Sequence, residues 1–425
     1  MKMWKKALVL FTAGIMLSAS LAGCKPGEPG NTSGGTDGNG QETKLVIWGN
    51  ETDEVLYSAI AAYEDAHPNV RIVVETQGET TLDMAISAGT APDIIRTASD
   101  YVATYGTKGY VADLTQYGAN DIKPLFTETT WNVANSIKDK VYSLPFDSNI
   151  INFIVNKDIL DAAGASIPTN YDEFLETGNK IKAKYGINSD TYAYTAACFD
   201  TLGTGLYKAW GTFHFYWWLW RMGGDIFTED MSDTRINDKV AVETLQMLLD
   251  LKNNGLAASQ YKNQEFIQGK VGMVEYVTYD FFKTVLGANS GNYEVAMMPQ
   301  LKEDVPPYTG MGLWCYAVTS SSKAPDVAYD FLKFFCTSKE YQLTYCKPGY
   351  YIPSLIEAQE DNYYKTPDWE IILEQAKYAK ATPGVNNWPA MDEAIYDAIQ
   401  LALDGTKTPQ AALDAAAEQI RALMK

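Results

Sequence analysis

The spacing of apolar residues changes repeatedly along the chain after its first forty residues. Short apolar runs at 44–48, 70–75 and 93–95 predict strands. Between them, residues 52–66 and 80–88 carry apolar side chains three and four positions apart, which predicts amphipathic helices. Strands that alternate with helices favour a parallel, doubly wound sheet. The predicted fold class is therefore α/β.

Helix signals recur further along. Thr169 is expected to cap a helix that ends near Gly186, because apolar residues between them share one face. Thr408 and Pro409 are expected to open another helix, because the first turn of a helix does not need the backbone N–H that proline lacks. We find no internal repeat.

The N-terminus has the order of a secretory signal peptide. Three lysines among the first six residues precede an uncharged apolar stretch over residues 7–19, and LAGC follows at 21–24. The apolar stretch is short for a transmembrane helix, so residues 1–23 are interpreted as a signal peptide. LAGC resembles the lipobox of bacterial lipoproteins, which implies that Cys24 is lipidated and becomes the first mature residue. The alternative is an ordinary signal peptide followed by a chance cysteine.

Residues 24–43 are expected to act as a lipidated cysteine followed by a flexible linker. Positions 25–43 contain no aromatic or large aliphatic residue and are rich in glycine, so they bury too little apolar surface to offset their ordering entropy. The remaining 44–425 is too long for one comfortable core, which predicts two domains.

The net charge limits the classes of ligand. It is −19 for the whole chain, and −22 without the three lysines of the signal peptide. This acidity disfavours nucleic acid and strongly anionic substrates, and it is compatible with neutral or cationic ones. Cys198, Cys315, Cys336 and Cys346 form no CxxC pair. Export permits a disulfide between the last two, but free buried thiols fit equally well.

Catalytic motifs are absent from the sequence. There are two histidines, His67 and His214, and no GxSxG, HExxH, Walker loop or GxGxxG. Glycoside hydrolysis needs only two carboxylates, and the chain has 53 acidic residues, so composition alone leaves that reaction open.

Six segments carry a resemblance over essentially all of 44–425. In order, they are GTAPDII (89–95), VYSLPFDSNIINFIVNKDILDAAG (141–164), IPTNYDEF (167–174), WRMGGDIF (220–227), GKVGMVEYVTYDFF (269–282) and TPQAALDAAAEQI (408–420). Together they resemble the family of bacterial extracellular solute-binding proteins that includes maltose-binding protein.

The resemblance implies a two-lobe, periplasmic-binding-protein-like fold with a hinge and an interlobe ligand cleft. Residues 44–146 plus 300–347 would form the N-terminal lobe, and 150–295 plus 352–425 the C-terminal lobe. Crossings between the lobes are expected near 145–151, 297–300 and 348–353. A ligand that contacts both lobes only when they close shifts the protein toward the closed form. Membrane subunits of an ABC permease would accept that form.

Aromatic residues with a polar edge point to a carbohydrate ligand, since there are 28 Tyr and 10 Trp against 15 Phe. A sugar ring packs its C–H face on an aromatic ring, and its hydroxyl rim needs hydrogen-bonding partners. The resemblance and the ends of the predicted strands select candidates. These ligand-binding candidates are Trp48, Asn50, Asp100, Tyr101, Asp147, Asn149, Phe213, Trp217, Tyr279, Gly312, Trp314 and Trp388. Tyr279 stands where relatives often have a stacking tryptophan.

The sequence thus predicts a monomeric binding protein, not an enzyme, anchored outside the cytoplasm by lipid on Cys24. It would capture an oligosaccharide for an ABC permease, with no catalytic residue, cofactor, metal site or nucleic-acid partner. Alternatives are the same fold binding a polyamine or peptide, a sensor that presents bound sugar to a receptor, and a glycoside-cleaving enzyme. The particular sugar and a bound calcium ion stay open.

Overall fold

The computed structural model describes residues 42–49, 53–76, 81–186, 189–196, 206–258, 260, 262–286 and 292–425. Residues 42–425 form one compact unit. The predicted signal peptide and the lipidation site Cys24 lie outside the described residues, as do most of the linker, Asn50 and Cys198. Within the described ranges, no helix is long and apolar enough to cross a membrane.

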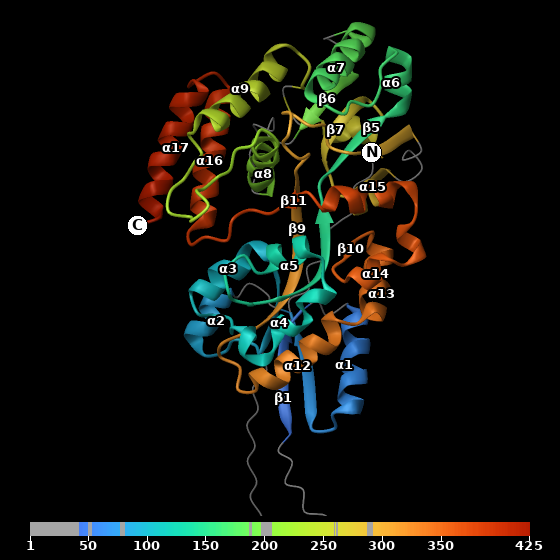
Figure 1. Ribbon diagram of the computed structural model, residues 1–425. Helices are drawn as coiled ribbons and strands as arrows, with labels where there is room; N and C mark the ends of the chain where they lie inside the picture. Colours follow the sequence, from blue (N-terminus) through green and yellow to red (C-terminus); the bar gives the residue numbers. More distant parts are fainter. Residues whose placement is uncertain are drawn as a thin grey trace, which may run out of the picture. The chain divides into compact units, whose positions relative to one another are not determined.

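A larger sheet carries seven strands (Figure 1). In spatial order they are β10 (Ile352–Pro353), β4 (Leu144–Ile150), β9 (Thr309–Val318), β3 (Ile94–Ala98), β1 (Thr43–Trp48) and β2 (Val70–Glu75), with β11 (Ala379–Lys380) paired to β9. The strands β1, β2 and β3 are parallel, as the sequence predicts. The predicted parallel sheet does not extend beyond these three strands, because β9 enters antiparallel to both β3 and β4.

A second sheet has four strands in the order β6 (Tyr192–Ala196), β7 (Val271–Val277), β5 (Asn152–Asn156) and β8 (Tyr293–Ala296). Only Ile151 separates β4 from β5, so the chain passes from one sheet to the other within one residue. It returns between β8 and β9. The first connection is a single residue and the second spans residues 297–308. Two chain crossings between the sheets suit a hinge.

Helices cover both sheets, and each core takes its side chains from different parts of the chain. The core of the larger sheet is built from buried residues within 45–146 and 316–358. The core of the smaller sheet uses residues within 151–301 and 388–420. A third cluster joins residues of both sheets, including Ile150, Ile154 and Met311. The lobe boundaries given above stay a prediction.

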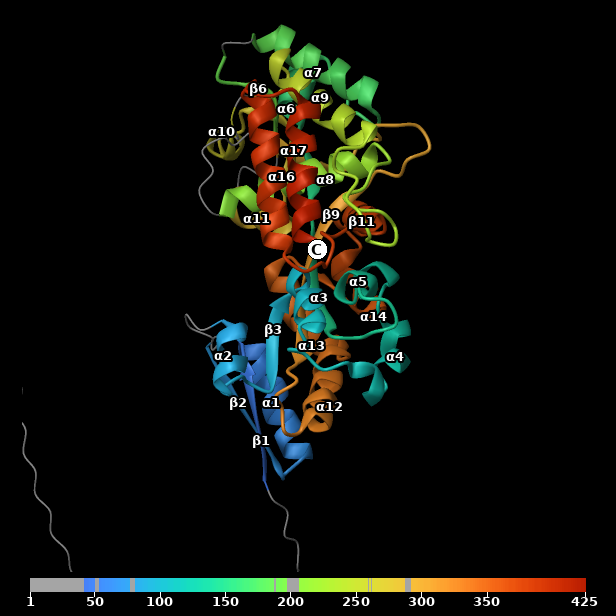
Figure 2. The ribbon, with the colours of Figure 1, turned by 90° about the vertical axis from the view of Figure 1, so that its left-hand side faces the viewer.

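The helices that contribute to the core of the larger sheet are α1 (Glu54–Ala66), α4 (Ala119–Ile122), α5 (Glu128–Ala134), α12 (Pro325–Cys336), α13 (Lys339–Gly349) and α14 (Ile356–Gln359). Those of the smaller sheet are α6 (Lys157–Ala163), α7 (Tyr171–Tyr185), α8 (Leu206–Arg221), α9 (Lys239–Asn253), α16 (Trp388–Leu403) and α17 (Pro409–Leu423). The remaining α-helices are α2 (Leu82–Ala88), α3 (Ser99–Thr107), α10 (Asn263–Ile267), α11 (Tyr279–Leu286) and α15 (Pro367–Ala376). Figure 2 shows α16 and α17 side by side.

Local signals explain where several helices begin. Thr408 caps α17 through its side chain and Pro409 follows, as predicted. The cap of α7 is Asn170, so the assignment to Thr169 is wrong by one residue. Thr169 instead donates its hydroxyl and its amide to the Glu173 carboxylate, at 2.7 and 2.8 Å. That contact completes a capping arrangement, since the Asn170 side chain accepts from the amide of Glu173.

Three cysteines, Cys315, Cys336 and Cys346, are free and buried. The disulfide considered between the last two is therefore not formed. Burial raises the pKa of each of the three thiols, which keeps them protonated. They act as small apolar core residues.

Candidate ligand-binding site

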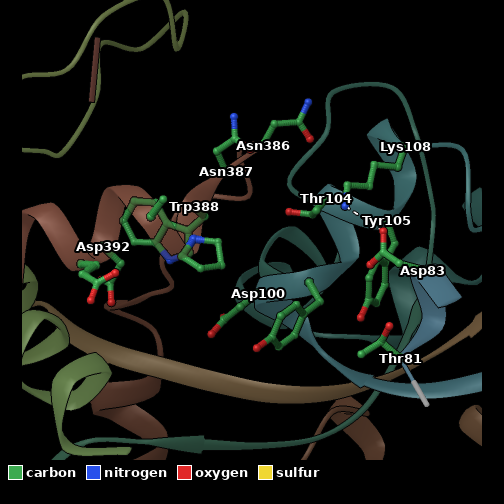
Figure 3. A pocket seen from close by; sticks show the side chains of 14 residues that line it. Thr81, Asp83, Asp100, Thr104, Tyr105, Lys108, Asn386, Asn387, Trp388 and Asp392 are labelled. Carbon is green, nitrogen blue, oxygen red and sulfur yellow. Dashed lines mark hydrogen bonds and ion pairs between the residues drawn. The ribbon is translucent and has the colours of Figure 1, made fainter. Parts of the chain in front are cut away.

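Two cavities adjoin where the helices of one lobe face those of the other. The first, which we call the β9 chamber, has a volume of about 460 Å³ and is lined by Ala98, Asp100, Asp147, Asn149, Ile151, Phe213, Thr278, Asp280, Met311, Gly312, Leu313, Trp314, Tyr351, Thr382, Trp388 and Asp392. The second, the α3 chamber, has a volume of about 910 Å³ and is shown in Figure 3. Asp100, Trp388 and Asp392 line both. The two chambers therefore form one continuous cleft.

The hinge strands form one wall of the β9 chamber. Asn149 of β4 is the register partner of Gly312 of β9, and Asp147 is the partner of Trp314. A Cβ atom added to Gly312 would meet no atom within 4 Å, so the chamber is open above this position. The site is thus built on the strand pair next to the interlobe crossing.

Asp147 is held by an arginine behind the wall. Its carboxylate lies 3.3 Å from the Arg96 guanidinium, which also donates to the Tyr345 hydroxyl at 2.8 Å. The guanidinium carbon lies 4.6 Å from the centre of the Trp314 ring. Burial raises the pKa of Asp147 to about 6, although the charge of Arg96 acts in the opposite direction. Arg96 therefore positions both a carboxylate and an indole that face the cleft.

Two further carboxylates face the cleft from helices α3 and α16. Asp100 lies in the first turn of α3 and Asp392 in α16, one turn after Trp388. Asp100 is exposed to the cleft, but the surrounding walls partly desolvate it and raise its pKa. Burial also raises the pKa of Asp392, to about 6, and the negative charge of Asp100 adds to that effect. Asp392 accepts the Tyr216 hydroxyl at 2.7 Å.

Aromatic rings supply flat surfaces in both chambers. The Trp314 side chain is 44% exposed, an unusual exposure for an indole on a central strand. Trp388 is mostly buried but lines both chambers. In the α3 chamber, Tyr101 stacks on Tyr105 with ring centres 5.9 Å apart. The cleft thus combines aromatic faces with carboxylate and amide groups.

Most of the candidates from the sequence come together here. The structure places Asp100, Asp147, Asn149, Phe213, Gly312, Trp314 and Trp388 around the β9 chamber, and Tyr101 in the α3 chamber. Asn50 lies outside the described residues. Trp48, Trp217 and Tyr279 do not line either chamber.

Each of these three residues lies in a core instead. Trp48 packs at the end of β1 with Leu82 and Ile95. The Tyr279 hydroxyl donates to Asp368 at 2.8 Å, and its ring lies 4.7 Å from that of Trp369.

Trp217 is fully buried because its indole has a partner in the core. Its N–H donates to the Glu275 carboxylate at 2.9 Å, and the neighbouring Trp218 donates to the same oxygen at 2.9 Å. Of the aromatic run at 213–220, only Phe213 lines the cleft.

The sequence reasoning missed several lining residues. These are chiefly Thr278, Asp280, Tyr351, Thr382 and Asp392 in the β9 chamber. Two of them carried a readable signal. Asp280 follows β7 at the start of a helix, as Asp100 follows β3. Asp392 lies four residues after Trp388, on the same helix face.

No group of three or more His, Cys, Asp and Glu side chains could hold a metal ion among the described residues. The polar contacts described at the cleft are hydrogen bonds and two ion pairs, Arg96 with Asp147 and Lys108 with Asp83. The geometry therefore suits reversible binding of a polar organic molecule.

The chain is similar to known proteins over most or all of its length. A family model described as bacterial extracellular solute-binding protein matches residues 58–383. The galactooligosaccharide-binding protein of Bacillus subtilis (strain 168) is 24% identical over 448 aligned residues, covering 100% of this chain and 99% of the relative. The maltotriose-binding protein of Pyrococcus abyssi is 26% identical, covering 75% of this chain and 68% of the relative.

Solved structures give the same fold. The cyclic alpha-maltosyl-1,6-maltose binding protein from Arthrobacter globiformis has a TM-score of 0.78 at 24% identity, covering 90% of this chain and 99% of that chain. A cyclo/maltodextrin-binding protein complexed with maltotetraose has a TM-score of 0.75 at 21% identity, covering 91% and 98%. The predicted two-lobe α/β fold is confirmed.

Proposed function

Because the chain belongs to the family of bacterial extracellular solute-binding proteins, we propose that it captures an oligosaccharide in the cleft and delivers it to an ABC permease. The observation that carries the proposal is the lining of the β9 chamber. It places the Trp314 and Trp388 rings beside the polar groups of Asp100, Asn149 and Asp392. The relatives named above are binding proteins for oligosaccharides, which supports binding rather than catalysis.

The chemistry of the lining matches that of a sugar. An aromatic ring receives the C–H face of a pyranose, and carboxylates accept hydrogen bonds from its hydroxyl groups more strongly than neutral acceptors do. The Oδ1 atom of Asp280 is buried beside the chamber without a hydrogen-bond partner among the described residues. A ligand hydroxyl would satisfy it.

Delivery requires closure of the lobes. The two strands of the hinge, β4 and β9, contribute Asn149 and Gly312 to the cleft, while α3 and α16 contribute Asp100 and Asp392 from opposite lobes. A sugar that contacts both helices stabilises the closed form over the open one. Small-angle scattering should therefore show a smaller radius of gyration with saturating sugar. An unchanged radius would contradict closure.

A thermal-shift screen tests the proposed ligand class. At a ligand concentration a hundredfold above Kd, binding stabilises the native state by about 2.7 kcal/mol. We expect maltotriose or β-1,4-galactotriose to raise the melting temperature and spermidine to leave it unchanged. The carboxylates of the cleft favour a polyamine as the second candidate, and a shift with spermidine alone would replace the sugar assignment.

Anchoring by lipid is part of the proposal. The LAGC sequence at 21–24, directly after an apolar stretch, supports attachment at Cys24 and a position outside the cytoplasm. Cys24→Ala should leave the fold intact and release the protein from the membrane fraction. Retention of this variant on membranes after a high-salt wash would argue against acylation there.

A further inference from the structure

The cleft is lined by acidic side chains far in excess of basic ones. Among the described residues that line either chamber, the carboxylates are Asp83, Asp100, Asp147, Asp280, Asp392 and Glu393, and the only cation is Lys108. Lys108 lies 3.0 Å from Asp83, and Arg96, behind the wall, lies 3.3 Å from Asp147. The basic groups are thus already engaged with two of the acidic ones.

The carboxylates of Asp100 and Asp392 stand where the two chambers meet. Both line both chambers, one from α3 and the other from α16, and Figure 3 shows their side chains in the same open space. Asp100 accepts a hydrogen bond from the Ser99 hydroxyl, and Asp392 accepts one from the Tyr216 hydroxyl. Both of these donors are neutral. A ligand that occupies both chambers therefore meets both residues.

Besides Asp100, Asp392 and the Arg96-paired Asp147, the β9 chamber is lined by the carboxylate of Asp280. It lies in the first turn of α11, and its Oδ1 atom is buried with no hydrogen-bond partner among the described residues. Charge interactions are stronger in such a partly desolvated space than in water. The raised pKa values of Asp100 and Asp392 are consistent with that environment, because they reflect desolvation.

We propose that Asp100, Asp280 and Asp392 make the cleft selective for uncharged saccharides and exclude saccharides that carry carboxylate, sulfate or phosphate groups. A neutral sugar offers hydroxyl donors to these acceptors. An anionic group in the same place offers no donor, and like charges brought together without water between them oppose binding. This inference rests on the proposed function, since it defines the class of oligosaccharide that the same site accepts.

The experiment compares matched neutral and anionic sugars on the full-length mature protein. Maltotriose and β-1,4-galactotriose are each titrated by calorimetry, before and after oxidation of their primary hydroxyls to carboxylates. The rings and the linkages stay the same, while each primary hydroxyl loses its O–H donor and gains a negative charge. The dependence on salt and the variants below report the contribution of the charge. We expect at least about a tenfold weaker affinity for the oxidised form, the ratio that corresponds to 1.4 kcal/mol. The ratio should fall as salt is raised, because salt screens charge interactions.

Variants assign the selection to the named residues. Asp100→Asn combined with Asp392→Asn should reduce the ratio of neutral to anionic affinity at least about threefold, by removing two like charges while keeping acceptor oxygens. The matched control is Glu418→Gln, an exposed residue of α17 that lines neither chamber and changes the net charge in the same sense. It should leave the ratio unchanged.

The outcomes separate the inference from the proposed function. Binding of the oxidised sugars as tightly as the neutral ones would overturn charge selection and leave sugar capture standing. An equal fall of the ratio in Glu418→Gln would show that the overall charge of the protein is responsible, and would overturn the assignment to the cleft residues. Binding of no sugar in either form would refute the proposed function, and the inference with it.

Discussion

Replacement of Glu275 by glutamine tests why the tryptophans of α8 are buried. The Glu275 carboxylate is fully buried and lies 2.6 Å from the guanidinium of Arg221, which is also fully buried. The same oxygen accepts the indole N–H groups of Trp217 and Trp218. The Arg221 guanidinium also donates to the carbonyls of Pro299 at 3.1 Å and of Trp217 at 3.4 Å, and neither of these groups carries a charge. Glu275→Gln keeps the shape and an acceptor oxygen but leaves Arg221 without a counter-charge.

The magnitude follows from the cost of an uncompensated buried charge. Removing one partner of a buried pair costs about 3–5 kcal/mol. That is a large fraction of a typical folding free energy of about 5–15 kcal/mol, so the variant should fold but unfold at a clearly lower denaturant concentration. Adding Arg221→Met removes the stranded charge. The double variant should therefore be at least about 1 kcal/mol more stable than the sum of the two single losses predicts.

The assay is urea unfolding followed by tryptophan fluorescence, repeated across pH. Burial alone would raise the pKa of Glu275, but Arg221 and His214 lower it to about 2. The lowered pKa means that the carboxylate stabilises the native state fully above pH of about 4.5, and that this contribution is lost as the pH falls toward about 2. The difference between wild type and Glu275→Gln should shrink over that range.

If Glu275→Gln lowers the free energy of unfolding by less than about 1 kcal/mol at neutral pH, this account is refuted. The Glu275–Arg221 pair would then contribute no more than an exposed ion pair does. Strict additivity of the two substitutions would refute it as well.

Three further substitutions probe the cleft, and two others, at Tyr57 and Gly310, serve as comparisons. Trp314→Ala should weaken sugar binding by about 0.5–1.5 kcal/mol, measured by calorimetry, whereas Tyr57→Ala, equally exposed at 44% but outside both chambers, should not. Gly312→Leu should place a side chain in the open chamber and weaken binding at least about tenfold without loss of stability. By contrast, Gly310→Ala should cost about 1–3 kcal/mol of stability, because its Cβ would lie 2.7 Å from the Phe213 ring. Asp392→Asn should raise the stability of the sugar-free protein by about 1–3 kcal/mol at pH 7 and by less at pH 4. The reason is that the pKa of Asp392 is raised to about 6, so its ionisation destabilises the native state only at the higher pH. Equal changes in stability at both pH values would contradict a raised pKa for Asp392.

The sequence predicted those parts of the fold that depend on local patterns. The strands β1 and β2 and the helices α1 and α2 follow from apolar spacing, and Thr408 with Pro409 marks the start of α17. The antiparallel entry of β9 could not be read locally. Its partners β3 and β4 lie more than 150 residues earlier in the chain, and nothing near residue 309 specifies the direction of pairing.

The site was predictable where position along a strand decides exposure. Asp100 and Asp147 were found because they follow or lie on strands near the hinge. Trp217 and Tyr279 were placed in the cleft by the resemblance, but their polar edges have partners far away in sequence, Glu275 and Asp368. Aromatic type alone does not separate a sugar platform from a core ring whose N–H or O–H is satisfied. The sequence did not show that these two rings are buried against partners distant in the chain.

Calorimetric titration of the wild-type protein with maltotriose, β-1,4-galactotriose and spermidine, each at low and high salt, tests the central claim most directly. The account predicts saturable binding of at least one neutral sugar, with an affinity that barely changes with salt because no ion pair forms. Heat from spermidine alone, with an affinity that falls as salt rises, would contradict sugar capture.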